Sequence, residues 1–385
     1  MTLQRSFIPP GKTGGIICHG QLGRMSILHS YGPFGYLSNV FGPPSAESPI
    51  GCGQEVATYR TLRDYTDEQA RLHFIKSCDF ITVETENLFD TKKQGDLMIW
   101  MHKNAGDKLF PSLDVIMTSA DRFREKLLFK KLNIPSAAYI EVHKDEKLAM
   151  PSFQGPFINK LRFGGFDGRG NDELDAYMLN ELHTSILNRF GNVDCILEEK
   201  VNFDFECSMG IARNANGEVG FTPLSYNIQK NGILIETKCS LSLQNHPVVK
   251  IARDYLLRIA KELNLIGFFV AEMFAIKEKS GQYKVMINET APRVHNSIHH
   301  SIESCSMSQF EMQLRAMCNL PLHDSELICE SVTMTNILYE YSQEEYLHWL
   351  SIPNTYVHLY NKKPNGKKTD NVTPRKIGHI TQLYY

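Results

Sequence analysis

Two glutamates stand inside apolar segments of the sequence, where a carboxylate is unusual. Glu272 lies in FFVAEMFAI and Glu289 lies in VMINETAPR, and both segments are typical of buried strands. An unpaired charge in such a place is costly, so each glutamate should have a cation or a buried arginine close by. Two hard carboxylates together with nucleotide phosphates are a common way to hold Mg²⁺. The pair therefore predicts a metal-nucleotide site, unless strand alternation turns Glu272 toward solvent.

A glycine-rich segment, FGGFDGRGN, follows a strand-like run that contains Lys160 and Arg162. Four glycines fall between positions 164 and 170, too many for a packed element and enough for a loop. The backbone amides of such a loop can fold over a polyphosphate while Arg169 supplies positive charge. The alternative is a plain flexible turn, which seldom follows a strand with two cationic residues.

The segment HGQLGR, residues 19–24, is a third candidate. A strand, a glycine turn and a helix start would present backbone N–H groups to an anion such as a phosphate. A full dinucleotide fingerprint would need glycine at Cys18 and an acidic residue near Gly42, and neither is present. We therefore expect no NAD site here, and the motif is either a phosphate site or a tight structural turn.

Cationic and imidazole side chains cluster in two further places. Arg122 and Lys126 are about one helical turn apart, a spacing that suits phosphates but is equally common on a solvated face. The segment APRVHNSIHHS combines Arg293 and His295 with two more histidines. Zinc is disfavoured there because no cysteine or carboxylate stands at the spacing that zinc sites use.

Alternating strands and helices are expected to position these residues in the N-terminal part of the chain. Buried strands are predicted at 15–18, 39–41 and 79–87, with one helix starting near Leu22 and another over 66–74. Strands that alternate with helices in this way form parallel, doubly wound sheets. The first part of the chain is therefore expected to be an α/β domain.

A new unit is expected near Ser119, which we interpret as the N-cap of a helix that ends at Pro135. Beyond it, runs such as CILEE, ECSMGIAR, GFTPLS and YKVMINE are typical of strands and are separated by turns or helices. This arrangement predicts a mixed α+β domain from Cys195 onward.

The composition is that of an ordinary soluble globular chain. Of 385 residues, 42% are hydrophobic and 22% are charged, which excludes a disordered or collagenous chain. The net charge of −2 gives little attraction to nucleic acid or to an anionic membrane. Nine scattered cysteines contain no C-x-x-C pair, so a reducing cytosol is expected. We expect neither secretion nor a membrane span.

Taken in order, the motifs of this chain resemble those of the ATP-grasp superfamily, and within it the N5-carboxyaminoimidazole ribonucleotide synthetase family. The resemblance runs from about Gly14 to Thr381 and rests on order and spacing rather than on any single motif. The segments that carry it are GQLGRM, DYTDE, ETEN, SADRFREK, GGFDGRGN, ILEEKVNFDFECS, AEMF, INETAPRVHNS, SQFEMQLRA and RKIGHIT.

The resemblance implies three regions, with ATP clamped between the second and the third. These are a Rossmann-like domain over 1–117, a small lid domain over 118–194, and a larger domain over 195–385 that ends in a small C-terminal subdomain. The implied ATP contacts are Lys126, Lys160, Asp167, Gly168, Arg169, Gly170, Glu198, Glu199, Val201 and Glu206. The implied magnesium ligands are Glu272, Glu289 and Asn288.

The resemblance also implies a second substrate, aminoimidazole ribonucleotide, bound against the first domain. Its phosphate and ring would meet Gln21, Arg24, Glu84, Glu86, Arg375 and Lys376. Arg293, His295 and Asn296 would sit where bicarbonate meets the reacting amine, with His295 handling or orienting a proton.

The implied reaction begins with ATP-dependent phosphorylation of bicarbonate, a poor electrophile, to carboxyphosphate. The amine of the ribonucleotide then captures this intermediate, or the CO₂ that it releases, in a closed site. The implied form of the protein is a cytoplasmic homodimer that uses ATP, Mg²⁺ and bicarbonate.

Several positions depart from the family pattern, and they cluster on the acceptor side. Cys18 and His19 replace two glycines, Phe166 replaces a tyrosine, Tyr226 replaces a glutamate and Ile298 replaces a glycine. The stretch 361–374 is also longer than expected. Two alternatives therefore stay open: a paralogue that acts on another amine, and a catalytically silent nucleotide-binding protein. The presence of both Glu272 and Glu289, the implied magnesium ligands, argues against the catalytically silent alternative.

Overall fold

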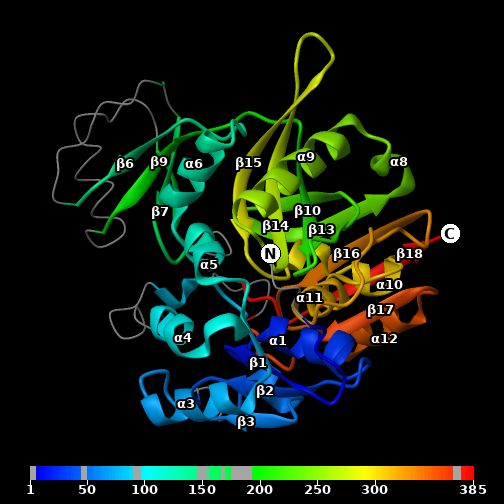
Figure 1. The fold of residues 1–385 in the computed structure, drawn as a ribbon. Helices are drawn as coiled ribbons and strands as arrows, with labels where there is room; N and C mark the ends of the chain where they lie inside the picture. The colour runs from blue at the N-terminus through cyan, green and yellow to red at the C-terminus, as the bar shows by residue number, and fades with distance from the viewer. Residues whose placement is uncertain are drawn as a thin grey trace.

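Three β-sheets with helices against them make up the described part of the chain (Figure 1). A five-stranded sheet comes first in the sequence, a four-stranded sheet second, and a nine-stranded sheet contains the remaining strands. In Figure 1 the first sheet lies at the bottom, the small sheet at the upper left and the large sheet on the right. This computed structural model describes residues 6–44, 50–89, 97–144, 153, 156–165, 170–174, 193–366 and 374–385.

The N-terminal sheet is parallel throughout and confirms the predicted doubly wound arrangement. Its order is β3-β2-β1-β4-β5, and each neighbouring pair is parallel. β1 is buried along its whole length, which suits the apolar strands of a sheet covered on both faces. The strands are β1 (Thr13–Ile17), β2 (Leu37–Phe41), β3 (Tyr59–Thr61), β4 (Phe80–Val83) and β5 (Leu109–Phe110).

The helices of this domain follow the strands, as the alternation predicts. α1 (Gln21–Ser26) comes directly after β1 and continues into a π-helical turn, η1 (Ile27–Tyr31). α3 (Glu68–Ser77) is capped by Asp67, whose side chain accepts a hydrogen bond from the Ala70 amide. The other helical segments are α2 (Cys52–Glu55), η2 (Asn87–Phe89), α4 (Leu97–Ala105), η3 (Gly106–Lys108) and α5 (Leu113–Ala120).

The small sheet is antiparallel, with the order β6-β9-β7-β8. β9 pairs with both β6 and β7, although it begins at Cys195, where we expected the third region to start. We therefore propose that the boundary follows Glu199. The strands are β6 (Tyr139–Val142), β7 (Phe157–Leu161), β8 (Asn171–Leu174) and β9 (Cys195–Glu199).

The helix before this sheet, α6 (Arg122–Lys131), starts later than predicted. Its N-cap is Asp121, whose carboxylate accepts a hydrogen bond from the Phe123 amide. Ser119 lies inside α5, so the prediction that Ser119 caps the helix is wrong. Serine and aspartate are both good N-caps, and the sequence alone did not show that the chain breaks between two helices at Asp121.

The large sheet is antiparallel, with the order β15-β14-β10-β12-β13-β16-β18-β17 and with β11 paired to β10. Its strands are β10 (Phe205–Arg213), β11 (Val219–Phe221), β12 (Ser225–Lys230), β13 (Ile233–Ser240), β14 (Gly267–Lys277), β15 (Tyr283–Ala291), β16 (Ser331–Ile337), β17 (Thr355–Leu359) and β18 (Gly378–Tyr384). Its helical segments are α8 (Leu241–Gln244), α9 (Pro247–Glu262), η5 (Asn296–Ile298), α10 (Ser301–Ser304), α11 (Gln309–Met317) and α12 (Gln343–Ser351). The predicted mixed α+β domain is confirmed.

Successive side chains of β14 lie on opposite faces of the large sheet. Ala271 packs in one apolar core with Leu256 of α9. Val270 packs in another with Phe310 of α11 and with residues of α1. The second core joins the first domain to the large sheet, and Glu272 shares the face of Val270. The alternation of β14 therefore turns this glutamate toward the junction of the domains.

The helix α9 has 16 residues and buries one face against the sheet. Its buried residues Val248, Ala252, Leu256 and Ile259 recur at the spacing of an amphipathic helix. Within the described ranges, no helix has both the length and the apolar character needed to cross a membrane.

Candidate active site

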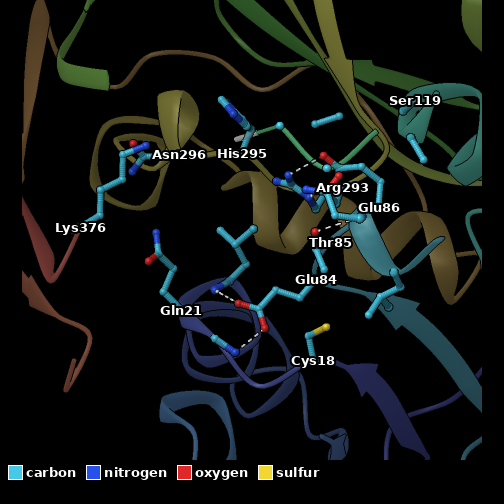
Figure 2. A pocket seen from close by; sticks show the side chains of 18 of the residues that line it. Cys18, Gln21, Glu84, Thr85, Glu86, Ser119, Arg293, His295, Asn296 and Lys376 are labelled. Carbon is cyan, nitrogen blue, oxygen red and sulfur yellow. Dashed lines mark hydrogen bonds and ion pairs between the residues drawn. The ribbon is translucent and has the colours of Figure 1, made fainter. Parts of the chain in front are cut away.

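A cleft of about 1270 Å³ opens where the domains meet, and Figure 2 shows it from close by. Its walls come from the end of β1, the start of α1, the residues after β4, the first turn of α6, and β14 and β15. The segment between β17 and β18 also contributes. The predicted site residues that line it are Gln21, Glu84, Glu86, Glu272, Asn288, Glu289, Arg293, His295, Asn296, Arg375 and Lys376.

Glu272 on β14 and Glu289 on β15 are direct cross-strand partners in the wall of this cleft. A β-bulge follows, since Met273 pairs with Ile287 and leaves Asn288 as the extra residue. The three side chains expected to hold magnesium are therefore neighbours on one bulged hairpin. Like charges directly opposite each other repel, so the carboxylate pair needs positive partners.

Arg122 and His295 approach the two carboxylates. Arg122 Nη1 on α6 lies 2.7 Å from Glu289 Oε2, and its side chain is 11% exposed. His295 Nδ1 lies 3.5 Å from Glu272 Oε1. Although burial opposes ionisation, Arg122 and Lys160 hold the pKa of Glu289 below its usual value. The side chain of Glu272 is 13% exposed, so the alternative that it faces bulk solvent is wrong.

Lys126 on α6 and Lys160 on β7 share the carboxylate of Glu198 on β9. Their Nζ atoms lie 2.8 Å and 2.7 Å from the two carboxylate oxygens, and all three side chains are buried. Burial lowers the pKa of Lys126. Burial opposes ionisation of Glu198 too, but the two lysines lower its pKa to about 2. Lys160 Nζ also donates to Asn288 Oδ1 at 2.9 Å, which links this triad to the carboxylate pair.

Three of the implied ATP contacts, Glu199, Val201 and Glu206, do not line the cleft. Glu206 on β10 has one buried carboxylate oxygen, Oε2, without a hydrogen-bond partner. Burial raises the pKa of Glu206 to about 7, and Glu289 adds to the shift. Glu199 is exposed at the end of β9, and Val201 is half-buried. A buried oxygen without a partner can accept a hydrogen bond from a ligand hydroxyl.

Most of the predicted phosphate loop is not described by the structure. The residues outside the described ranges include Asp167, Gly168 and Arg169. Gly170 has a φ of +81°, in the left-handed region that favours glycine. Before the loop, Arg162 donates two hydrogen bonds of 2.9 Å and 2.8 Å to Asp121, which tie the end of β7 to the start of α6.

Glu84 occupies the helix start at which a phosphate was expected. Its carboxylate accepts hydrogen bonds from the Gly20 amide at 2.5 Å and from the Leu22 amide at 2.7 Å. An anion at these amides would have to displace Glu84, so the structural alternative for HGQLGR fits better. Arg24 does not line the cleft, and its Nη1 donates to Glu55 at 3.0 Å.

Two cationic residues that line the cleft were not singled out by the sequence analysis. Lys362 and Lys363 line it together with Arg375 and Lys376. Lys362 Nζ donates to Gln21 Oε1 at 2.5 Å and so joins the C-terminal segment to α1. The available signal was the basic run NKKPNGKK, which by itself is typical of a solvated loop.

Glu86 and Arg293 form a two-point ion pair between the first domain and the segment after β15 (Figure 2). Nε donates to Oε2 at 2.6 Å, and Nη2 donates to Oε1 at 2.9 Å. This paired geometry is among the strongest that a guanidinium makes. The resemblance implies that Glu84 or Glu86 faces the acceptor ring; here Glu84 binds the amides at the start of α1 and Glu86 faces Arg293.

His295 and Asn296 are held by buried amides. The Gln309 side chain accepts a hydrogen bond from the His295 amide at 2.8 Å and donates to the His295 carbonyl at 2.9 Å. His295 Nδ1 also lies 2.9 Å from Ser297 Oγ. The Asn296 side chain exchanges two hydrogen bonds with Asn336, of 2.9 Å and 2.7 Å. The side-chain amide of Asn296 is therefore held by Asn336 whether or not a ligand is bound.

Two further histidines are buried with hydrogen-bond partners. His300 bonds to the hydroxyls of Ser225 and Ser304 at 2.8 Å, and burial lowers its pKa to about 4. His299 Nδ1 lies 2.8 Å from Gln309 Nε2, and burial holds its pKa well below the usual value. Across the part of the chain that the structure describes, no group of three or more His, Cys, Asp or Glu is placed to hold a metal ion.

A contact between α6 and β15 also escaped the sequence analysis. The Thr290 amide donates to Glu125 Oε1 at 2.9 Å, and the Thr290 hydroxyl bonds to the same oxygen. Ser119 Oγ lies 3.1 Å from Thr290 Oγ1. Burial raises the pKa of Glu125 to about 8. This network fixes α6 against the strand that carries Glu289.

The departures from the family pattern fall in different places. Cys18 and His19 line the cleft, and Cys18 has a φ of +82°, which is unusual for a residue other than glycine. Tyr226 and Ile298 do not line it, and Ile298 is fully buried in the core. Phe166 lies outside the described residues.

Three family models match the chain in order. The ribonucleotide synthetase preATP-grasp domain matches residues 11–115, and the ATP-grasp domain matches residues 127–310. The phosphoribosylaminoimidazole carboxylase C-terminal domain matches residues 332–384. Together with the two antiparallel sheets and the carboxylate pair on the large one, these matches define an ATP-grasp protein.

Similar proteins narrow this class. The N5-carboxyaminoimidazole ribonucleotide synthase of Bacillus subtilis (strain 168) is 30% identical over 98% of this chain and 93% of its own length. The bifunctional purine synthesis protein purC/E of Dictyostelium discoideum is 32% identical over 97% of this chain, which spans 37% of that protein. A solved ADP complex of N5-carboxyaminoimidazole ribonucleotide synthetase has a TM-score of 0.82 at 32% identity, covering 98% of this chain and 94% of that one. The chain belongs to the N5-carboxyaminoimidazole ribonucleotide synthase family.

Proposed function

We propose that this protein carboxylates aminoimidazole ribonucleotide to N5-carboxyaminoimidazole ribonucleotide with ATP and bicarbonate, a step of purine synthesis. The observation that carries the proposal is the cleft in which Glu272 and Glu289 lie near Arg293 and His295. The first domain supplies one wall of that cleft and the large sheet supplies another, so two substrates can meet there. Membership of the family supports the same activity.

ATP is proposed to bind between the small sheet and the large sheet. Lys126 and Lys160 supply positive charge for its phosphates, and Glu198 keeps the two ammonium groups together. The unpartnered oxygen of Glu206 suits a ribose hydroxyl. The loop 164–170 is proposed to cover the phosphates.

Glu272, Glu289 and Asn288 form a donor set that fits Mg²⁺. All three offer oxygen atoms from one bulged hairpin, and Mg²⁺ commonly takes one or two carboxylates together with substrate phosphates. When bound, Mg²⁺ would neutralise charge on the phosphoryl group during its transfer.

Arg293 and His295 are proposed to act on the bicarbonate side. An oxygen of bicarbonate attacks the γ-phosphorus of ATP, ADP leaves, and carboxyphosphate results. The Arg293 guanidinium stabilises the negative charge of the transferring group and orients bicarbonate. The His295 ring, whose Nδ1 lies 2.9 Å from Ser297 Oγ and 3.5 Å from Glu272 Oε1, orients or moves a proton.

The acceptor is proposed to lie against the first domain. Its phosphate would meet cationic side chains, because the amides at the start of α1 already bind Glu84. The groups available for that phosphate are Gln21, Lys362, Lys363, Arg375 and Lys376. The amine attacks the carboxyl carbon, phosphate leaves, and a closed cleft protects the labile intermediate from water.

A cytoplasmic location and a homodimeric state are also part of the proposal. All nine cysteines are free in the structure, and eight of them are buried. Free thiols without disulfides support a reducing compartment. The homodimer rests on the family resemblance alone.

The test is an assay of ADP release in which aminoimidazole ribonucleotide and bicarbonate are left out in turn. We expect ADP release that requires both. Turnover that needs bicarbonate but ignores the ribonucleotide would favour a paralogue acting on another amine. If ATP with Mg²⁺ neither turned over nor raised the melting temperature, the catalytically silent alternative would be favoured.

A further inference from the structure

The Glu86–Arg293 ion pair joins two parts of the chain that are proposed to hold different substrates. Glu86 follows β4 in the first domain, and Arg293 follows β15 of the large sheet, 207 residues further along the chain. Both side chains line the cleft, and they are 12% and 13% exposed. Bulk water therefore competes little with the pair, unlike with an ion pair on the surface.

The pair fixes the plane of the Arg293 guanidinium. Nε and Nη2 donate to the two oxygens of Glu86 at 2.6 Å and 2.9 Å, while Nη1 donates to the Val294 carbonyl at 3.2 Å. All three nitrogens of the planar group thus have a contact that sets their direction. A planar, two-point pair orients a guanidinium in a way that a single contact does not.

The segment that carries Glu86 is itself anchored. Glu84, two residues earlier, binds the amides of Gly20 and Leu22 at the start of α1. Figure 2 shows Glu84 toward α1 and Glu86 toward Arg293, with Thr85 between them. The two carboxylates therefore connect the start of α1 to the guanidinium on the other side of the cleft.

We propose that Glu86 is a positioning residue for Arg293 in the phosphorylation of bicarbonate, a role that rests on the proposed function. Arg293 touches the reacting groups, and Glu86 acts only through it. Glu86 belongs to the first domain, which is proposed to hold the acceptor. Docking of this domain against the large sheet therefore fixes the position of the Arg293 guanidinium beside bicarbonate. A displacement of about 1 Å at a reacting centre is enough for a loss of about 100-fold in rate.

The test is a double-substitution cycle on the full chain, read as kcat and as KM for ATP. Glu86→Gln keeps the shape but removes the charge, so kcat should fall about 10- to 100-fold while KM for ATP stays within about twofold. Arg293→Lys keeps the charge but loses the planar group, and kcat should fall at least as far. The double variant should be no slower than Arg293→Lys alone, because Glu86 then has no guanidinium to position.

Two further variants separate positioning from folding. Glu86→Asp keeps the charge and should recover part of the activity that Glu86→Gln loses. Glu311→Gln is the control, because Glu311 forms an ion pair with Arg315 on α11, away from the cleft. Its Oε1 accepts a hydrogen bond from Arg315 Nε at 2.7 Å and lies 2.6 Å from Arg315 Nη2. Glu311→Gln should leave kcat unchanged.

The outcomes are distinct. Unchanged kcat in Glu86→Gln would overturn the proposal. So would a double variant whose fold reduction in kcat equals the product of the two single reductions. A higher KM for the ribonucleotide with normal kcat would assign Glu86 to acceptor binding and would also overturn it. If the wild-type protein turned over ATP but ignored the ribonucleotide, the proposed function would fail, and the cycle run on bicarbonate-dependent ADP release would still test Glu86. Absence of any ATP turnover would overturn both.

Discussion

Glu272 and Glu289 stand directly opposite each other on adjacent antiparallel strands, at the edge of a bulge that sets Asn288 out of register. Two carboxylates in this arrangement repel each other, and the Arg122 guanidinium beside Glu289 offsets part of that repulsion. Arg122 is 2.7 Å from Glu289, and His295 is 3.5 Å from Glu272. A divalent cation between the two carboxylates would relieve the same repulsion, which is why this hairpin is the centre of the proposed site.

Replacing Glu289 with glutamine should nearly abolish ATP turnover. Glu289→Gln removes one of the two charges proposed to hold Mg²⁺ and leaves Arg122 without its ion-pair partner. We expect ADP release to fall by at least about 100-fold, the size of loss seen when charge stabilisation is removed from an active site. Glu278→Gln, at an exposed position after β14, is the control and should behave as wild type. Equal activity of the two variants would contradict the assignment.

The buried triad should contribute strongly to stability. Glu198→Gln leaves Lys126 and Lys160 buried without a compensating charge, and breaking a buried pair in this way costs about 3–5 kcal/mol. This loss of stability is measured as a lower urea concentration at the midpoint of unfolding. The comparison is Glu173→Gln, which breaks the exposed pair with Lys200 and should cost no more than about 1 kcal/mol. Similar shifts for both variants would show that the triad is not a buried ion pair.

Acid should destabilise the protein partly through His300. Burial lowers its pKa from 6.5 to about 4 in the folded protein, so between these values the unfolded chain binds more protons. Stability is therefore lost as the pH falls through this window. Between about pH 6.5 and about pH 5, protonation of His300 in the unfolded chain should lower the free energy of unfolding by about 2 kcal/mol. His300→Gln should remove this contribution. Urea unfolding at both pH values measures it, with exposed His102→Gln as the control, and an unchanged loss in His300→Gln would refute the assignment.

Cys18 is expected to narrow the acceptor end of the cleft. Its φ of +82° strains any residue other than glycine, but glycine also gives the unfolded chain more freedom. These effects oppose each other, so Cys18→Gly should change stability by less than about 1 kcal/mol. Because the side chain lines the cleft, its removal should lower KM for the ribonucleotide and leave KM for ATP unchanged. A higher KM for the ribonucleotide would mean that the thiol makes a useful contact.

The sequence predicted the parts of the fold that depend on local pattern. The apolar run of β1 and the glycine turn after it were sufficient for a parallel strand followed by a helix, because burial on both faces leaves a continuous apolar signature. Glu272 and Glu289 could be found because a carboxylate inside an apolar strand needs a partner. Their pairing across two strands then brought them together in one wall of the cleft.

Contacts between distant segments could not be predicted in this way. Nothing in the local sequence indicates that Glu84 folds back onto the amides of α1, or that Glu198 holds two lysines from different elements. Lys362 reaches Gln21 only because the C-terminal segment passes beside α1, more than 300 residues from it in sequence. Such pairs depend on how the domains dock, and docking leaves no periodic signal in the sequence.

Bicarbonate labelled with heavy oxygen tests the central claim most directly. If the cleft activates bicarbonate by phosphorylation, the oxygen that bridges carbon and phosphorus leaves with phosphorus when the amine attacks the carboxyl carbon. Mass spectrometry of the inorganic phosphate should then show one labelled oxygen for each molecule of N5-carboxyaminoimidazole ribonucleotide formed. Unlabelled phosphate alongside normal product formation would contradict the account, because bicarbonate would then have been captured without ever being phosphorylated.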